Sequence, residues 1–257
     1  MSSATASIQL IVFGQRNKED IAGVLREVKE AGFPAIEAGD MFATYGEAET
    51  RRLLAETGLR VSGSHFGYGE YADSEKLSAH VATCKAMGIT NMMCSGVADS
   101  KTVEGYRQSC RLFNEVGARL RDEGIAFNYH NHAWEFEDLE GKGVTGMEII
   151  SEQTDPALVK FNIDAFWVKF GGADPAEFIR RHRDRAGYFH FKDGERGLDG
   201  RPVFLELGRG FVDLKSAMAA AREVGAEWIV AEQDSTTLPH LESITISRRY
   251  MRDELGV

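Results

Sequence analysis

The stretch from Ile125 to Glu137, IAFNYHNHAWEFE, combines an apolar strand pattern with a dense group of side chains that can bind metals or move protons. Ile125, Phe127 and Tyr129 alternate with smaller or polar residues, which predicts a strand. Directly after this pattern come the polar and aromatic residues His130, Asn131, His132, Trp134, Glu135 and Glu137. In α/β proteins, functional groups lie at the carboxyl ends of such strands. The stretch therefore predicts a functional site at the end of this strand.

Most other predicted strands end in groups of the same kind. In chain order these groups are Glu37, His65, Cys94 with Ser95, Asp164, His190 and Glu232. A closed parallel barrel brings the carboxyl ends of all its strands onto one rim. The pattern therefore predicts that carboxylates and imidazoles from most of the strands converge on a single site.

The elements that must position these groups alternate between strand and helix along the whole chain of 257 residues. Apolar runs predict strands over residues 8–13, 34–37, 59–63, 89–93, 125–129, 158–163, 187–191 and 227–231. Amphipathic helical patterns lie between them, and Asp174 followed by Pro175 marks a helix start. Eight such units in a chain near the usual barrel length of roughly 250 residues predict an α/β fold, a (β/α)8 TIM barrel forming a single domain over residues 1–257.

Composition narrows the classes of function. Lys and Arg number 30 against 40 Asp and Glu, so the formal net charge is −10, which disfavours a surface that follows nucleic-acid phosphates. The three cysteines, without a CxxC motif, predict reduced thiols in a cytoplasmic protein. The N-terminal sequence lacks the basic and apolar regions of a signal peptide, and no apolar run approaches the ~20 residues of a membrane span. We therefore expect no nucleic-acid partner and no membrane partner.

The mixture of carboxylates and imidazoles at the strand ends predicts a divalent cation, either Mn²⁺, Mg²⁺, Co²⁺ or Zn²⁺. No cysteine falls at a spacing typical of a structural zinc site. A cation of this kind acts as a Lewis acid on a carbonyl and acidifies the proton on the adjacent carbon. Neighbouring carboxylates and imidazoles can then transfer that proton.

The motifs YHNHAWEF, NIDAFWV, YFHFKDG, LGRGFVD and VAEQD, in this order and spacing, resemble the xylose isomerase-like TIM barrel superfamily, the sugar phosphate isomerase/epimerase and family-2 AP endonuclease group. The resemblance covers essentially the whole chain. It implies a metal site built from a carboxylate after the fifth strand, an aspartate after the sixth, a histidine in the seventh and a glutamate after the eighth. Asp164, His190 and Glu232 match the last three positions directly.

The fifth-strand ligand departs from the family pattern. Many members have a glutamate where this chain has His130, so either Glu135 reaches back into the site or His130 itself binds the metal. We favour Glu135, because a hard cation prefers oxygen and a carboxylate keeps the usual charge of the site. A histidine common in family isomerases is replaced by Trp167, which argues against a standard ketose epimerase. The YHNH and HFKDG motifs resemble the branch that acts on keto-sugars, cyclitols or 3-keto-glycosides.

These arguments assign a role to each candidate residue. The metal ligands are predicted as Glu135, Asp164, His190 and Glu232, and the catalytic residues as Glu135, Glu232, His132 and Lys192. The substrate-binding residues are predicted as His65, His130, Trp134, Glu37 and Trp167. Purely structural roles stay open for several of them. Asp164 could cap a helix, Glu37 could hold the rim together, and Lys192 could form a surface ion pair.

The leading hypothesis from the sequence is a divalent-metal-dependent sugar isomerase or epimerase that transfers a proton next to a carbonyl of a sugar or keto-sugar. The alternative is a metal-dependent lyase or dehydratase of a keto-cyclitol or 3-keto-glycoside that uses the same site. An AP endonuclease-like phosphodiesterase and a non-catalytic sugar-binding subunit are less favoured. The expected partner is a small-molecule sugar or keto-sugar. The sequence leaves a homo-oligomer open.

Overall fold

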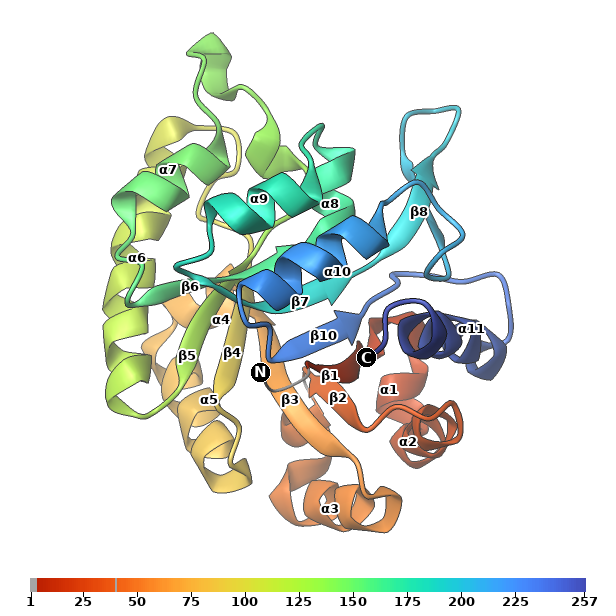
Figure 1. Ribbon diagram of the computed structural model, residues 1–257. Coiled ribbons are helices and arrows are strands. Elements are labelled where there is room, and N and C mark those ends of the chain that lie inside the picture. The colour runs from red at the N-terminus through yellow and green to blue at the C-terminus, as the bar shows by residue number, and fades with distance from the viewer. Residues whose placement is uncertain (1–3, 40) are drawn as a thin grey trace.

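The computed structural model describes residues 4–39 and 41–257, and these form a closed parallel barrel surrounded by helices (Figure 1). Around the barrel the strand order is β1-β10-β7-β6-β5-β4-β3-β2, and every neighbouring pair is parallel. The barrel strands are β1 (Thr5–Gln9), β2 (Ala35–Ala38), β3 (Arg60–Gly67), β4 (Asn91–Ser95), β5 (Ala126–His130), β6 (Val159–Asp164), β7 (Ala186–Phe191) and β10 (Trp228–Ala231). The predicted (β/α)8 TIM barrel is confirmed.

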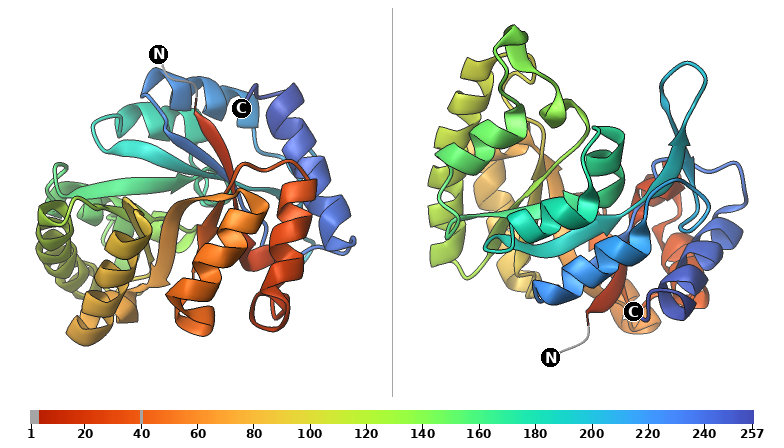
Figure 2. Two further views of the ribbon diagram at one scale, coloured as in Figure 1. Left: turned by 90° about the horizontal axis from the view of Figure 1, so that it is seen from below. Right: turned by 45° about the horizontal axis from the view of Figure 1, so that its top comes forward.

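The helices cover the outside of the barrel, as both views in Figure 2 show. The α-helices are α1 (Arg16–Glu19), α2 (Ile21–Glu30), α3 (Met41–Thr57), α4 (Tyr68–Ala72), α5 (Ser74–Met87), α6 (Val103–Asp122), α7 (Gly146–Gln153), α8 (Ala165–Phe170), α9 (Pro175–Arg181), α10 (Leu214–Glu223) and α11 (His240–Asp253). The described residues also include three short 3-10 helices: η1 (Leu10–Phe13), η2 (Trp134–Phe136) and η3 (Leu139–Gly141). Among the described residues, no helix is both long enough and apolar enough to cross a lipid bilayer.

Side chains at the helix ends explain where several helices begin. Asp174 caps α9 by accepting a hydrogen bond from the Glu177 backbone N–H, and Pro175 occupies the first turn, as the sequence predicted. Thr145 and Glu148 form a reciprocal capping box at the start of α7. Each of these caps satisfies backbone donors that have no partner inside the helix.

Two local predictions were wrong. The apolar run 8–13 is not one strand, because β1 ends at Gln9 and Leu10–Phe13 form the 3-10 helix η1. Leu10, Val12 and Phe13 are nevertheless buried, and an apolar run alone does not distinguish a strand from a helical turn. The glycine-rich segment after β7 contains an unpredicted antiparallel hairpin, β8 (Asp193–Arg196) with β9 (Pro202–Leu205), which projects from the barrel in Figure 2.

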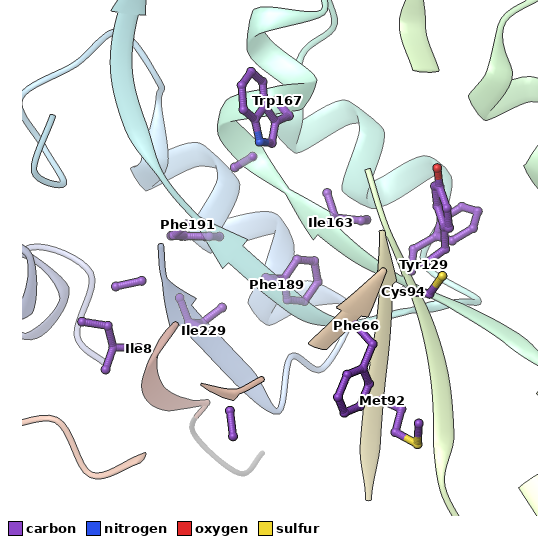
Figure 3. Packing of buried hydrophobic residues seen from close by; sticks show 14 of the residues in the cluster. Ile8, Phe66, Met92, Cys94, Tyr129, Ile163, Trp167, Phe189, Phe191 and Ile229 are labelled. Carbon is purple, nitrogen blue, oxygen red and sulfur yellow. The ribbon is translucent and has the colours of Figure 1, made fainter. Parts of the chain in front are cut away.

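The buried side chains form two layers that follow the two-residue period of the strands. The large apolar layer lies between the strands and the helices, and Figure 3 shows part of it, including Ile163, Phe189 and Ile229. Within the part of the chain that the structure describes, a small second apolar cluster of Met93, Tyr188 and Val230 lies in the barrel interior, with Trp228 packed against it. Most of the remaining interior positions are polar or charged, so the barrel interior is where the chemistry-bearing side chains gather.

Candidate active site

Four side chains at neighbouring strand ends form one compact group, which we call the open cluster: His130, Asp164, His190 and Glu232. One ligand atom from each residue lies within 4.8 Å of the others, and all four side chains are buried. The register of the barrel strands brings these residues together. His190 is paired with Asp164 on β6 and with Val230 on β10, and Val230 precedes Glu232 by two residues. Three of the four are residues that the sequence predicted as metal ligands.

The atoms of the open cluster face one another without forming a complete set of hydrogen bonds. His130 Nε2 lies 3.5 Å from Asp164 Oδ2 and 3.5 Å from Glu232 Oε2, which is long for a hydrogen bond. His190 Nδ1 contacts Glu232 Oε2 closely. Among the described residues, both His130 ring nitrogens and Asp164 Oδ2 are buried without a hydrogen-bond partner. Buried polar atoms are normally paired, so these atoms indicate a site for a ligand.

Asp164 has two roles at once. Its Oδ1 accepts a hydrogen bond of 2.8 Å from the Trp167 backbone N–H and so caps helix α8, which begins directly after β6. Its Oδ2 is the unpartnered atom in the open cluster. Asn131 holds the Asp164 backbone in place, because its Oδ1 accepts from the Asp164 N–H at 3.0 Å and its Nδ2 donates to the Asp164 carbonyl at 3.4 Å. The helix-cap alternative for Asp164 is therefore compatible with a ligand role.

The donor atoms of the open cluster fit a divalent cation. Two imidazole nitrogens and two carboxylates form a set that binds transition ions such as Zn²⁺, Co²⁺ and Mn²⁺, with imidazole favouring these ions over Mg²⁺. Two carboxylates also balance the charge of one divalent ion. The unpartnered Nε2 of His130 and Oδ2 of Asp164 would gain the partner that they lack in the protein alone.

Glu135 lies outside the open cluster, contrary to the expectation that it supplies the fifth-strand ligand. Its Oε1 accepts a hydrogen bond of 2.7 Å from the Tyr129 hydroxyl, and its Oε2 accepts one of 2.8 Å from the His132 backbone N–H. Tyr129 belongs to the apolar layer on the outer side of the barrel, so Glu135 is held on that side. Its carboxylate therefore supports the loop after β5, and His130 is the residue at the end of β5 that belongs to the open cluster.

Glu37 begins a second set of buried polar groups, which we call the closed network: Ser7, Ser62, Tyr188, Glu37 and His65. Glu37 Oε2 accepts from the Tyr188 hydroxyl at 2.8 Å and lies 2.6 Å from His190 Nε2, while its Oε1 lies 3.0 Å from His65 Nδ1. Glu37 is fully buried, and protein groups occupy both of its oxygens. The substrate-binding role predicted for Glu37 is therefore wrong for this geometry, and Glu37 instead orients His190 from behind.

The closed network continues into the barrel through hydroxyl groups. The Tyr188 hydroxyl lies 2.9 Å from Ser62 Oγ, and Ser62 Oγ lies 2.8 Å from Ser7 Oγ. Ser62 also donates to the Ile36 carbonyl at 3.1 Å. Each of these three hydroxyls has a partner, so hydrogen bonding stabilises this part of the barrel interior.

A cavity of about 490 Å³ opens above the open cluster. Five of the predicted site residues line it: His65, His130, His132, Lys192 and Glu232. It is lined as well by residues without a predicted role: Gln9, Ile11, Phe66, Gly67, Gly69, Glu70, Ser95 and Asp234. A cavity of this size suits a small molecule.

Lys192 and Asp234 form an ion pair beside the open cluster. Lys192 Nζ lies 2.8 Å from Asp234 Oδ1, 3.4 Å from Glu232 Oε1 and 3.7 Å from Asp164 Oδ2. Lys192 is 1% exposed, so the surface ion pair considered for it is wrong. Asp234 was missed, although it stands only two residues after Glu232 in the VAEQD motif. Asn131, which stands between two predicted site residues, was also given no role.

The two predicted aromatic residues support the site from its edge. Trp134 stacks on His132 with ring centroids 3.9 Å apart, and the Lys192 ammonium lies 5.0 Å from the centre of the Trp167 ring. Trp167 is 9% exposed, and neither tryptophan lines the cavity. The two rings pack against His132 and Lys192 instead of facing the cavity, which does not support the predicted stacking of either ring on a substrate.

Burial and neighbouring charges shift the pKa values of the site. Burial raises the pKa of Glu135 to about 7, and hydrogen bonds from Tyr129 and His132 only partly oppose this. Burial would raise the pKa of Glu37, but His190 and His65 outweigh it and hold that pKa at about 2. Burial, together with the charges of His130 and Lys192, lowers the pKa of His132 well below its usual range. His132 is therefore a neutral imidazole near pH 7.

Comparison with known proteins identifies the family to which this barrel belongs. Residues 25–254 match the family described as Xylose isomerase-like TIM barrel, and the chain belongs to this family. The resemblance stated from the motifs is thereby confirmed.

Relatives and solved structures agree with this family assignment. The chain is 24% identical over 273 residues to an inosose dehydratase of Geobacillus thermodenitrificans, a match that covers 91% of this chain and 89% of the relative. Its fold is similar to that of a sugar phosphate isomerase/epimerase from Parabacteroides distasonis, with a TM-score of 0.82, 21% identity and 98% of both chains covered. It is also similar to a structure of IolI protein with a bound zinc atom, with a TM-score of 0.76, 14% identity and 98% of both chains covered.

Proposed function

We propose that the chain is a divalent-metal-dependent enzyme that removes a proton next to the carbonyl of a polyhydroxylated ketone, and that elimination of water completes the reaction. The observation that carries this proposal is the open cluster, where buried donor atoms of His130 and Asp164 have no partner among the described residues at the base of a polar cavity. A bound cation supplies Lewis-acid polarisation of the substrate carbonyl.

His132 is the proposed base. It lines the cavity, and its Nδ1 is buried without a hydrogen-bond partner among the described residues. Stacking on Trp134 fixes the plane of its ring, and its lowered pKa keeps it ready to accept a proton. Glu232 is also predicted as a catalytic residue, but its Oε2 contacts His190 and its Oε1 lies 3.4 Å from Lys192 Nζ. Nδ1 of His132 has no such contact among the described residues.

Lys192 is the proposed acid. Burial would lower its pKa, but the carboxylates of Glu232, Asp164 and Asp234 outweigh this and raise it, so the ammonium is charged near pH 7. An ammonium at the cavity wall can protonate a leaving hydroxyl group and let it depart as water. Elimination needs such an acid, and a relative whose match covers 91% of the chain is named a dehydratase. These two points support a lyase acting on a keto-cyclitol or keto-sugar.

Isomerisation or epimerisation is the second candidate, because the similar Parabacteroides structure is named a sugar phosphate isomerase/epimerase. Both reactions begin with the same proton abstraction. They differ in whether the proton returns to carbon or a neighbouring hydroxyl group leaves.

One experiment tests the proposal and separates the two candidates. Metal-loaded protein is incubated in D2O with a panel of keto-sugars and keto-cyclitols, and turnover is followed by proton NMR. Elimination is expected to produce a new alkene or enol signal, whereas isomerisation exchanges the carbon-bound hydrogen and forms an isomer. Turnover with that hydrogen fully retained would contradict proton abstraction altogether.

Two variants assign the roles of base and acid. His132→Asn is expected to slow both hydrogen exchange and product formation. Lys192→Met is expected to slow elimination while hydrogen exchange continues. Lys215→Met, which removes an exposed lysine paired with Glu254 away from the cavity, is the matched control and should leave the elimination-to-exchange ratio unchanged. Equal loss of exchange and elimination in Lys192→Met would contradict the acid role of Lys192.

A further inference from the structure

The cavity wall carries more negative than positive charge. Of the described residues that line it, Lys192 is the one with a permanent positive charge, whereas Glu70, Glu232 and Asp234 contribute carboxylates. A substrate phosphate group is a dianion near pH 7 and is normally bound by arginine, lysine or clustered backbone N–H groups. Lys192 and the backbone N–H groups near the cavity are the groups that could bind one.

Lys192 is already surrounded by carboxylates. Its Nζ contacts Asp234 at 2.8 Å, Glu232 at 3.4 Å and Asp164 at 3.7 Å. A phosphate that approached this ammonium would also approach those acids. A divalent cation would neutralise the charges of Asp164 and Glu232, but the Asp234 carboxylate would still be paired with the Lys192 ammonium. The ammonium therefore offers little net attraction to a second anion.

The backbone N–H groups after β7 are occupied as well. TIM barrels that bind phosphate frequently use N–H groups from the loops after the seventh and eighth barrel strands. Here the buried Asp193 carboxylate takes that position, accepting from the N–H of Gly194 at 2.9 Å, Gly208 at 3.0 Å, Gly210 at 2.9 Å and Val212 at 3.2 Å. The glycine-rich loop thus folds around an anion that belongs to the protein.

We infer that the enzyme takes an uncharged, unphosphorylated polyhydroxylated ketone and discriminates against the phosphate esters of such compounds. This inference rests on the proposed function and narrows its substrate class. It depends on three features: the acidic cavity wall, the carboxylates around Lys192, and the loop N–H groups filled by Asp193. Hydroxyl groups of a neutral substrate can donate to the carboxylates at the wall, which a phosphate group cannot do.

Matched pairs of compounds test the inference. Metal-loaded protein is given neutral ketoses and keto-cyclitols, each beside its own phosphate ester, and kcat/KM is measured by proton NMR in D2O. The neutral member of a pair is expected to have a kcat/KM at least about ten-fold higher than its ester, because of charge repulsion and loss of hydrogen bonds. An ester that reacts as well as its neutral partner would overturn the inference and leave the proposed function intact. Absence of exchange across the whole panel would overturn both.

A charge variant tests the cause of the discrimination. Glu70 lies at the cavity wall, and its side chain is 34% exposed and paired with Lys76. Glu70→Gln is expected to narrow the ratio between neutral substrate and ester by about two-fold, the size expected for one partly screened charge. Glu104→Gln is the matched control, since Glu104 is an exposed acid paired with Arg111 on α6 and does not line the cavity. An identical ratio in both variants would contradict a discrimination set by the charge of the wall.

Discussion

The open cluster and the closed network are built from the same kinds of side chain, lie in the same barrel interior and meet at His190. In the closed network, Glu37 has both oxygens bonded, and the hydroxyls of Tyr188, Ser62 and Ser7 are bonded in turn. In the open cluster, His130 and Asp164 keep buried atoms without partners among the described residues. Residue type and burial are therefore shared, and hydrogen-bond satisfaction separates the two.

The difference shows how one barrel provides both rigidity and a binding site. An unpaired buried polar atom costs about 1–3 kcal/mol, so several such atoms facing one another at the base of a cavity indicate a site for a ligand. The closed network has no such cost and holds His190 from its Nε2 side, which leaves Nδ1 facing the open cluster. The comparison predicts that substitutions in the open cluster abolish ligand binding, whereas substitutions in the closed network weaken it indirectly.

The largest expected effect comes from removing a carboxylate of the open cluster. Asp164→Asn and Glu232→Gln should each lower affinity for Zn²⁺ or Co²⁺ by roughly 100-fold or more, because a charged ligand is lost. The amide introduced by Asp164→Asn still offers an oxygen to cap α8, so the fold should persist by circular dichroism. Isothermal titration with chelator-buffered metal measures the affinity. Wild-type affinity in both variants would remove the metal assignment.

The next largest expected effect on metal affinity distinguishes His130 from Glu135 as the metal ligand at the end of β5. His130→Asn should weaken metal affinity by about 30-fold, whereas Glu135→Gln should change it by less than about three-fold, because only His130 reaches the open cluster. The Co²⁺-substituted protein adds a spectroscopic check, since loss of an imidazole ligand changes the visible spectrum. The opposite order of affinities would return the ligand role to Glu135.

Glu37 tests whether the closed network acts through His190. Glu37→Gln should reduce metal affinity by about ten-fold, the usual size for losing a partner that orients a ligand. Ser7→Ala, at the far end of the same network, is the control and should leave metal affinity unchanged within error. Equal metal affinities in the two variants would show that Glu37 does not act on the open cluster through His190.

The smallest effect concerns His182, a partly buried histidine outside both groups. Burial, followed by the charges of Arg185 and Arg181, lowers its pKa to about 4. Below the unfolded-state pKa of about 6.5, the unfolded chain binds a proton that the fold excludes, so stability falls as pH drops from 6.5 toward 4. Allowing for its partial exposure, we expect a loss of about 1 kcal/mol between pH 7 and pH 5.

Urea unfolding at the two pH values, compared between wild type and His182→Gln, isolates this contribution. The wild type should lose more stability than the variant on acidification. A variant that loses as much as the wild type would show that His182 does not titrate in this window.

The hairpin β8–β9 and the position of His130 are two features that the sequence analysis did not predict. The hairpin β8–β9 was missed because its pairing follows from the loop closing around Asp193, a contact with residues 15 to 19 positions away. The position of His130 was within reach of the sequence: Phe127 and Tyr129 belong to the outer apolar layer, so His130 shares the inward face with Asn128. The charge pattern of the family, which favours Glu135, is a weaker guide to the geometry than this alternation.

The sequence by itself determined the barrel, the family and the rim on which the site lies, because strand and helix periods and strand-end residues are local properties of the chain. Only the tertiary structure decided that Glu37 supports His190, that Asp234 pairs with Lys192, and that His130 completes the cluster. Those outcomes depend on which polar atoms find partners in space. Glu37 and His190 are 153 residues apart in the chain, and no local pattern records the hydrogen bond that joins them.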